Sequence, residues 1–374
     1  MSKGKLIQIL AVVFFLGVIA LAIFIIFNRE KAVRQQADVA NLKLASFFES
    51  LDNNYVKCNL CPNRCLLAPE QTGLCKSRKN IGGQLYSLVY GKVVAVYNDP
   101  IEKKPLYHFL PSSKAYSIAT TGCNMACKFC QNWDISQKFS SEVQSRDMTP
   151  EQVVDEALKT GASSIAYTYT EPTIFFEFML ATAKLAREKS LKNIMHSNGY
   201  INQEPLLELI PYLDAANIDL KGITDKYYSD YTFNGKVGPV LDTLKTLKQK
   251  AVWLEVTNLL IPGANDSRED IEKLISWIKD NLGVETPLHF SRFFPLYKLE
   301  NLISTPLSSM QQAYEIAKKN GLNYVYLGNI ESDRGNNTYC SDGELAIRRV
   351  GYFVMENNLV DGKCANGEAV AGVW

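Results

Sequence analysis

The first feature of the hydrophobic pattern is a long apolar run near the start of the chain. From Leu6 to Phe27 there are 22 residues without a charged side chain, and only Gln8 is strongly polar. A helix of that length spans about 33 Å, enough for a hydrocarbon core of about 30 Å. We therefore expect residues 1–28 to form a single-pass membrane anchor. A cleaved signal peptide, for which no small-residue cleavage site follows the run, and a buried core helix are the alternatives.

Charges on the two sides of this run bear on its orientation. Two lysines within residues 3–5 precede it, and three basic residues within 29–34 follow it. This small excess favours a body on the cytoplasmic side after the run. Residues 29–54, with charges spread through them, are predicted to form a short helical stalk.

From about residue 115 onward, short apolar runs alternate with amphipathic segments, which is typical of a parallel sheet built from βα units. One helix is expected to begin at Thr149, with Pro150 in its first turn and Gln152 completing a capping box. Six or seven such repeats predict a partial α/β barrel over residues 111–330. The expected strands are 115–119, 163–168, 192–196, 215–218, 252–257, 288–292 and 324–327.

Residues 55–110 have a different pattern. The segment Gln84–Asn98 is rich in β-branched and aromatic residues around Gly91, which predicts a hairpin or a pair of strands. Four cysteines precede it. We therefore expect a small cysteine-rich β cap before the barrel, and residues 331–374 form a C-terminal extension.

Composition excludes one class of partner and suggests a kind of chemistry. Forty Lys and Arg nearly balance 39 Asp and Glu, so no global basic field would attract nucleic acid. Nine cysteines against three histidines are many for 374 residues. Cysteines spaced by two or three residues suit metal binding better than disulfides. These features indicate a reducing compartment.

The segment Thr121–Cys130 reads TGCNMACKFC and places Cys123, Cys127 and Cys130 directly after the first predicted barrel strand. Loops at the C-terminal ends of barrel strands form the active-site face. Three thiolates can hold three irons of a 4Fe-4S cluster and leave the fourth iron open, whereas electron-transfer clusters are normally closed by four protein ligands. A zinc site, or a cluster closed by a distant ligand, is the alternative.

With this motif in its context, residues 55–374 resemble the radical S-adenosylmethionine (SAM) superfamily. More narrowly, they resemble the pyruvate formate-lyase-activating-enzyme-like branch known as the AmmeMemoRadiSam system radical SAM protein. DPIEKKPLYHF (99–109) and GCNMACKFCQN (122–132) carry the resemblance. It implies a partial radical SAM barrel in which SAM binds the open iron. One electron from a low-potential donor then splits SAM to a 5'-deoxyadenosyl radical.

Three further motifs, TYTEPT, HSNGY and IDLKG, each follow a predicted strand. The resemblance implies a role for each motif. The cluster motif provides an apolar neighbour for adenine, and TYTEPT provides a carboxylate for the amino group of SAM. HSNGY provides contacts to ribose and carboxylate, and IDLKG provides two more contacts to SAM or substrate. Taken singly, each motif could be a helix start, a turn or a surface pair. The candidates are Phe129, Glu171, Ser197 with Asn198, and Asp219 with Lys221.

Later segments similar to the family place four more polar side chains at strand ends. Glu255, Asn258, His289 and Arg292 are candidates to line the substrate side. They could equally satisfy polar groups at the barrel rim.

Two other groups of cysteines lie outside the cluster motif. Four are spaced C-x2-C-x3-C-x9-C, enough to close a tetrahedral zinc site or a second iron-sulfur cluster, and the pattern does not choose between them. These are Cys58, Cys61, Cys65 and Cys75. Cys340 and Cys364 stand where relatives tend to carry paired C-x2-C knuckles, but here the sequences are CSDG and CANG. We expect this last pair to be free, buried thiols.

The sequence thus predicts a radical SAM enzyme of the cell membrane, with its catalytic body in the cytoplasm, where an oxygen-sensitive cluster meets SAM and reductant. The resemblance to activating enzymes suggests a glycine of a partner protein as the substrate, whereas the narrower family need not serve a glycyl-radical enzyme, so the substrate stays open. The anchor suggests a substrate or partner at the lipid bilayer. The alternative is a membrane-tethered iron-sulfur sensor or electron carrier that does not cleave SAM.

Overall fold

The computed structural model describes residues 4, 14–19, 23–24, 39, 41–233 and 235–374. The predicted membrane-spanning run at 6–27 falls mostly on residues outside this set. Among those described, no helix is long and apolar enough to cross a membrane. Residues Leu44–Trp374 form one compact unit. The finer domain boundaries drawn from the sequence remain predictions.

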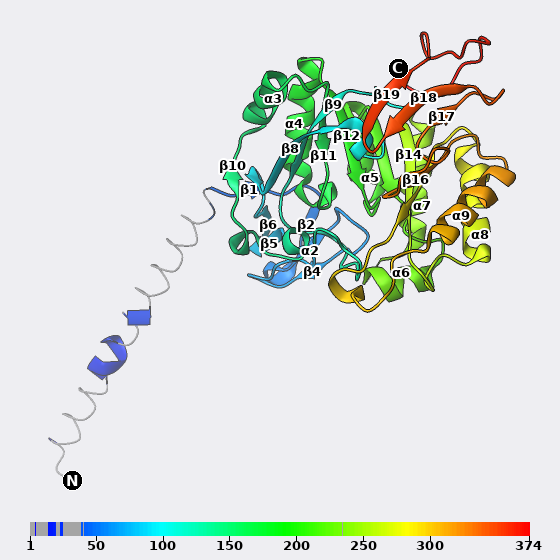
Figure 1. The fold of residues 1–374 in the computed structure, drawn as a ribbon. Coiled ribbons are helices and arrows are strands. Elements are labelled where there is room, and N and C mark those ends of the chain that lie inside the picture. Colours follow the sequence, from blue (N-terminus) through cyan, green and yellow to red (C-terminus); the bar gives the residue numbers. More distant parts are fainter. Residues whose placement is uncertain (1–3, 5–13, 20–22, 25–38, 40, 234) are drawn as a thin grey trace. The chain divides into compact units, whose positions relative to one another are not determined.

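The unit is organised around one eight-stranded sheet (Figure 1). Its strands in spatial order are β16 (Val325–Gly328), β15 (Leu288–Arg292), β14 (Trp253–Leu260), β13 (Ala215–Asp219), β12 (Lys192–Ser197), β11 (Ser164–Tyr167), β9 (Lys114–Ala119) and β8 (Ala95–Pro100). The seven strands from β9 to β16 are parallel, and β8 runs antiparallel to β9. Because β16 and β8 form its two edges, the sheet is an open, partial barrel. The predicted βα pattern is confirmed.

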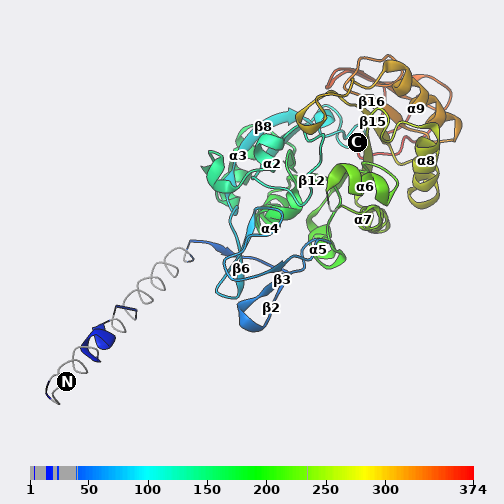
Figure 2. The same cartoon turned by 90° about the horizontal axis from the view of Figure 1, so that it is seen from below.

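Helices connect the parallel strands and lie outside the sheet (Figures 1 and 2). They are α3 (Pro150–Lys159), α4 (Phe176–Glu188), α5 (Gln203–Leu209), α6 (Asp225–Thr232), α7 (Val237–Gln249), α8 (Arg268–Leu282) and α9 (Leu307–Lys319). The predicted capping box is present, since Thr149 accepts a hydrogen bond from the Gln152 amide and the Gln152 side chain accepts one from the Thr149 amide. Their apolar faces, such as Val153, Leu244 and Ile275, are buried in the main core.

The segment before the barrel contains short strands. They are β1 (Lys43–Leu44), β2 (Phe48–Ser50), β3 (Val56–Cys58), β4 (Leu66–Leu67), β5 (Arg78–Ile81), β6 (Gln84–Ser87) and β7 (Lys92–Val93), with β10 (Arg146–Asp147) following later. Residues 43–50 therefore do not form the helical stalk that was predicted, because the chain there contains β1 and β2, and β2 pairs with β3.

The sequence predicted a hairpin or a pair of strands within residues 84–98. Strands are present, but they do not form a hairpin with one another: β6 lies between β1 and β5, β7 pairs with β10, and β8 pairs with β9. Gly91 explains part of this arrangement. It has a φ of +73°, and a Cβ there would lie 2.7 Å from the Met148 carbonyl oxygen. The chain turns at Gly91 to reach a distant strand, not to fold back on itself.

The C-terminal extension is a three-stranded antiparallel sheet of β17 (Thr338–Tyr339), β18 (Leu345–Val350) and β19 (Phe353–Asn357). Cys340 and Cys364 form a disulfide, with a Cα–Cα distance of 6.3 Å. The expectation of free thiols was therefore wrong for this pair. Each cysteine begins a turn closed by a glycine amide, and Glu368 of one turn accepts hydrogen bonds from Ser341 of the other, which brings the two sulfurs together.

A buried carboxylate fixes the 99–109 segment to the barrel. Glu255 accepts hydrogen bonds from the amides of Tyr107 (3.0 Å) and His108 (2.8 Å), from Trp253 Nε1 (3.0 Å) and from His289 Nε2 (2.6 Å). Glu255 and His289 are both buried. Both side chains satisfy polar groups of the chain, which is one of the two interpretations drawn from the sequence. Neither side chain lines an open substrate side.

The other two residues of that group also bond to the chain. Asn258 donates to the Leu220 carbonyl at 2.7 Å, and Arg292 Nε donates to the Thr305 carbonyl at 2.8 Å. They tie neighbouring strands and loops together.

His108 makes the stability of this region dependent on pH. Its ring lies between the Ala371 carbonyl and the Tyr326 hydroxyl, and burial lowers its pKa from 6.5 to about 4, although Glu255 opposes the shift. His108 therefore binds a proton less readily in the folded state than in the unfolded state. The stability that the neutral ring contributes is lost as the pH falls from 6.5 toward 4. Between pH 7 and pH 5 we expect this group to cost about 2 kcal/mol of unfolding free energy.

Urea denaturation at several pH values checks this expectation. Wild type should lose more stability on acidification than a His108→Phe variant, because the variant has no ring to titrate. Equal acid slopes for the two proteins would show that His108 is not the group responsible.

Candidate functional site

The loop with Cys123, Cys127 and Cys130, called the cluster loop below, joins the C-terminal end of β9 to helix α2 (Trp133–Ser136). Its place after a barrel strand is the one that the sequence predicted. Two backbone hydrogen bonds attach it to α6: the amide of Ala126 donates to the Thr232 carbonyl, and the amide of Lys128 donates to the Tyr231 carbonyl. The thiols are thus held at the mouth of the barrel, where the catalytic groups of βα barrels lie.

Hydrogen-bond donors surround these sulfurs. Cys123 Sγ accepts from the Met125 amide at 3.4 Å and from Asn198 Nδ2 at 3.7 Å, and Cys130 Sγ lies 3.2 Å from Ser136 Oγ. Burial raises the pKa of Cys127 to about 12 and that of Cys123 well above its usual value. Burial therefore favours the neutral thiols at these two positions, although Lys221 opposes the shift at Cys127.

All three cysteines are free thiols. Three soft thiolate donors fit the irons of a 4Fe-4S cluster and would leave its fourth iron open.

Glu171 lies at the N-terminus of a short 3-10 helix (Pro172–Phe175) after β11 and is almost completely buried. Its carboxylate accepts four hydrogen bonds: from Thr173 N (3.0 Å), Thr173 Oγ1 (2.7 Å), Ser197 Oγ (2.7 Å) and Asn198 N (2.9 Å). Burial raises the pKa of Glu171, and the four donors oppose the shift. Glu171 thus joins the β11 loop to the turn after β12.

Asn198 connects this turn to the cluster loop through a residue that the sequence analysis did not single out. Its Nδ2 donates to Asn124 Oδ1 at 2.8 Å, and Asn124 Nδ2 donates to the Tyr200 carbonyl at 2.7 Å. Asn124 and Asn198 are both buried. The signal for Asn124 was its place directly after Cys123 in the motif, since an amide there can bond across to the next strand end.

A charged group lies at the C-terminal ends of β12 and β13. Asp219 is bonded to His196 Nε2 at 3.0 Å and to Lys221 Nζ at 2.7 Å, and Lys221 Nζ lies 5.6 Å from the ring centre of Phe129. Burial opposes the charge on Asp219, but Lys221 and His196 outweigh it and hold the pKa of Asp219 well below its usual range. The structure therefore brings Phe129, Asp219 and Lys221 together, as a site for opposite charges beside an aromatic ring.

The 99–109 segment, which carries part of the family resemblance, contributes a second charged group. Lys104 Nζ is buried and lies 2.6 Å from Asp99 Oδ2 and 3.2 Å from Tyr169 Oη. Burial lowers the pKa of Lys104 to about 8, although Asp99 opposes the shift. Asn132 Nδ2 donates to the Tyr169 carbonyl at 2.6 Å, so this group is linked to the cluster loop.

Gly122 is the point where the cluster loop has no space for a side chain. Its φ is +99°, and a Cβ there would lie 2.1 Å from Ser77 Oγ and 2.4 Å from the Cys75 carbonyl oxygen. We expect Gly122→Ala to displace the loop, to lower the iron content after reconstitution and to destabilise the fold by about 2 kcal/mol or more.

Gly161→Ala is the matched control, because Gly161 also has a positive φ (+69°) but a Cβ there would meet nothing within 4 Å. It should cost about 1 kcal/mol and leave the iron content unchanged. Iron analysis and denaturation of both variants check this. Similar effects in the two would show that backbone strain alone matters at Gly122.

Comparisons with known proteins find similar sequences. A family model described as the radical SAM superfamily matches residues 117–278. An uncharacterized protein of Methanocaldococcus jannaschii is 46% identical over 309 residues, which cover 82% of this chain and 92% of that protein. The pyruvate formate-lyase-activating enzyme of Clostridium pasteurianum is 26% identical over 172 residues, covering 44% of this chain and 69% of that enzyme.

A further relative is the 4-hydroxyphenylacetate decarboxylase activating enzyme of Clostridium scatologenes. It is 24% identical over 206 residues, covering 51% of this chain and 62% of that enzyme. The residues matched by the family model include the cluster loop and the strand ends that carry Glu171, Asn198 and Asp219.

Proposed function

Since this chain belongs to the radical SAM superfamily, we propose that Cys123, Cys127 and Cys130 bind the 4Fe-4S cluster of a radical SAM enzyme and that SAM binds beside it. When bound, the reduced cluster supplies the electron that splits SAM into methionine and a 5'-deoxyadenosyl radical, which abstracts hydrogen from a substrate. The observation that carries the proposal is the convergence of the three thiols with polar side chains from the ends of β11, β12 and β13.

The charged group suits the amino-acid end of SAM. A carboxylate and an ammonium side by side, as in Asp219 and Lys221, match a ligand that carries one charge of each sign. Phe129 offers an apolar face to the adenine. Asn198, which donates to Cys123 Sγ, would hold the ligand beside the cluster loop, together with Ser197.

Glu171 is proposed to act mainly by positioning Ser197 and Asn198. Its carboxylate already accepts four hydrogen bonds from the chain. A direct contact to the SAM amino group, which the family resemblance implies, would add a fifth donor to the same group. Replacing Glu171 should therefore weaken SAM binding through the turn after β12.

The substrate is proposed to be a partner protein, because two relatives are named as activating enzymes of other enzymes. The surface beside the cluster loop supports this idea. Trp133 stacks on Tyr297 with ring centres 5.2 Å apart, and the side chains of Trp133, Phe294 and Leu296 are all exposed. Exposed apolar side chains close together favour a protein partner over a small polar substrate.

The cellular setting is a separate part of the proposal. We propose that residues 6–27 anchor the protein in the cell membrane, with its body in the cytoplasm, where SAM and a low-potential electron donor are present. The support is the uncharged apolar run. Retained function in cells after exchange of the anchor for a soluble tag would argue against a substrate at the bilayer.

The test is cleavage of SAM by the full chain, purified and reconstituted without oxygen. With dithionite as reductant, we expect 5'-deoxyadenosine and methionine, and a change in the electron paramagnetic resonance (EPR) spectrum of the reduced cluster when SAM is added. A reducible cluster with neither product nor spectral change would contradict the proposal and favour an iron-sulfur sensor or carrier.

We also propose that the thiols of Cys58, Cys61, Cys65 and Cys75 bind metal.

A further inference from the structure

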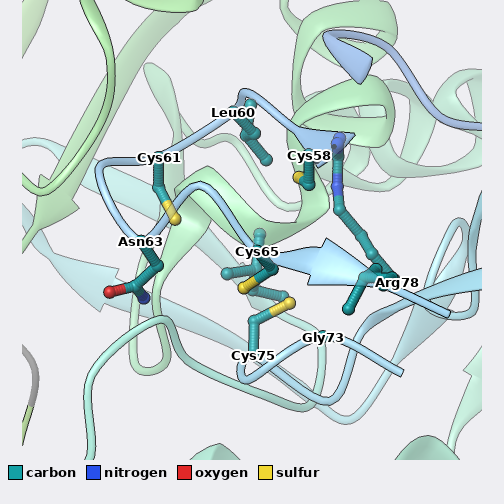
Figure 3. A pocket seen from close by; sticks show the side chains of 10 residues that line it. Cys58, Leu60, Cys61, Asn63, Cys65, Gly73, Cys75 and Arg78 are labelled. Atoms are coloured by element: carbon teal, nitrogen blue, oxygen red, sulfur yellow. Dashed lines mark hydrogen bonds between the residues drawn. The ribbon is translucent and has the colours of Figure 1, made fainter. Parts of the chain in front are cut away.

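The four cysteines before the barrel line one cavity (Figure 3). They come from the end of β3, from the turn between β3 and β4, and from the turn before β5. Their sulfur atoms point into the same space, and Arg78 borders it. Cys58, Cys61, Cys65 and Cys75 are all free thiols.

Four soft thiolate donors around one cavity suit a 4Fe-4S cube, in which each of the four irons takes one thiolate.

Gly73 also lines the cavity, and a Cβ there would make ordinary contacts with Cys75 Sγ at 3.8 Å and Cys65 Sγ at 4.0 Å.

Arg78 places a positive charge at the wall. It is fully buried and donates through Nη1 to Cys58 Sγ at 3.8 Å and to the Ser46 carbonyl at 2.8 Å, while Nη2 pairs with Glu177. Within the described structure its Nε has no hydrogen-bond partner. Glu177 balances the charge of this guanidinium, while the donor at Nη1 is placed to stabilise a thiolate at Cys58.

Direct hydrogen bonds join this cavity to the SAM cluster loop. Asn63 Nδ2 donates to the Asn124 carbonyl at 2.8 Å. Ser77 Oγ lies 3.0 Å from the Cys75 carbonyl oxygen and 3.1 Å from that of Thr121, two residues before Cys123. Gly122 packs against the same groups. The two sets of ligands are therefore neighbours with a short hydrogen-bonded path between them.

We propose that Cys58, Cys61, Cys65 and Cys75 hold a second 4Fe-4S cluster, closed by four thiolates, that passes electrons to the cluster at Cys123. A low-potential one-electron carrier protein reduces the second cluster from the 2+ to the 1+ state. The electron then moves to the first cluster, which goes from 2+ to 1+ as the second returns to 2+. The relay rests on the proposed function, but the second cluster itself does not.

The first test counts iron in the full chain with Cys123, Cys127 and Cys130 all changed to alanine. After anaerobic reconstitution we expect about 4 iron and 4 sulfide per chain in this variant and about 8 of each in wild type. The reduced variant should give an EPR signal that SAM does not change. The complementary variant, with alanine at the other four cysteines, should retain about 4 iron and a signal that SAM does change.

These counts do not depend on SAM cleavage, so they separate the second cluster from the proposed function. About one zinc with no iron in the first variant would overturn the proposal. A wild-type content of only about 4 iron, with no metal in the first variant, would also overturn it. If the first variant does not fold, the wild-type count and the complementary variant still decide.

The second test concerns the relay. In Cys75→Ser, SAM cleavage driven by a flavodoxin-type carrier should be lost to a greater extent than cleavage driven by dithionite, a small reductant that can reach the first cluster directly. An equal loss with both reductants would show that electrons do not pass through the Cys75 site.

Discussion

Replacing Cys127 by alanine is expected to abolish the formation of 5'-deoxyadenosine. Cys127 is one of only three thiols in the loop after β9, and it is buried. Two thiolates hold the cube poorly, and the loss of the open iron removes the place where SAM binds. The measurement is product formation by the reconstituted variant under dithionite, with detection down to about 0.1% of the wild-type rate.

Cys340→Ala is the matched control, because it removes a cysteine that forms the disulfide of the C-terminal extension. It should retain SAM cleavage. Iron should fall in Cys127→Ala but not vanish, since the Cys58 group is untouched. Cleavage by Cys127→Ala at more than a few per cent of wild type would mean that another residue completes the cluster.

Glu255→Ala is expected to cause the largest loss of stability in the barrel, about 4 kcal/mol. The carboxylate is fully buried and accepts hydrogen bonds from two backbone amides, an indole and an imidazole. Truncation leaves these donors buried without an acceptor, at about 1–3 kcal/mol for each that finds no other partner. The free energy of unfolding from urea denaturation gives the measurement.

Glu269→Ala provides the comparison on the surface. Glu269 forms an exposed pair with Lys273 one turn along α8, so its loss should cost no more than about 0.5 kcal/mol. A small effect of Glu255→Ala, similar to that of the control, would show that the 99–109 segment is held by its apolar contacts and not by this carboxylate.

The barrel could be predicted because its strands are short, apolar and separated by amphipathic helices. Leu288–Arg292 matches the predicted strand at both ends, and the others differ by only a few residues. The strand pairing of segment 84–98 could not be predicted, for a physical reason. Its β-branched pattern identified strands, but it carried no information on their partners, and Gly91 sends the chain to β10 instead of back on itself.

The site could be predicted where a sequence motif indicates the type of ligand. It was less predictable where the role of a residue depends on its hydrogen-bond partners in the fold. The position of the Cys123 loop followed from its place after a strand. The four-fold acceptor role of Glu171 and the link from Asn124 to Asn198 depend on which donors the fold brings near, and these come from separate strand ends. The Cys340–Cys364 pairing depends on two distant turns meeting, which neither cysteine's local sequence reveals.

The order of the parallel strands has a consequence for how the protein is made. From β9 to β16 the order in space is the order in the chain, so each strand that leaves the ribosome finds its neighbour already present. All seven thiols of the two cysteine groups, and the strand ends as far as Asp219, are synthesised before Glu255 and His289. The cysteines that we propose to bind metal are therefore all present on the nascent chain while the carboxylate that fixes the 99–109 segment is still missing.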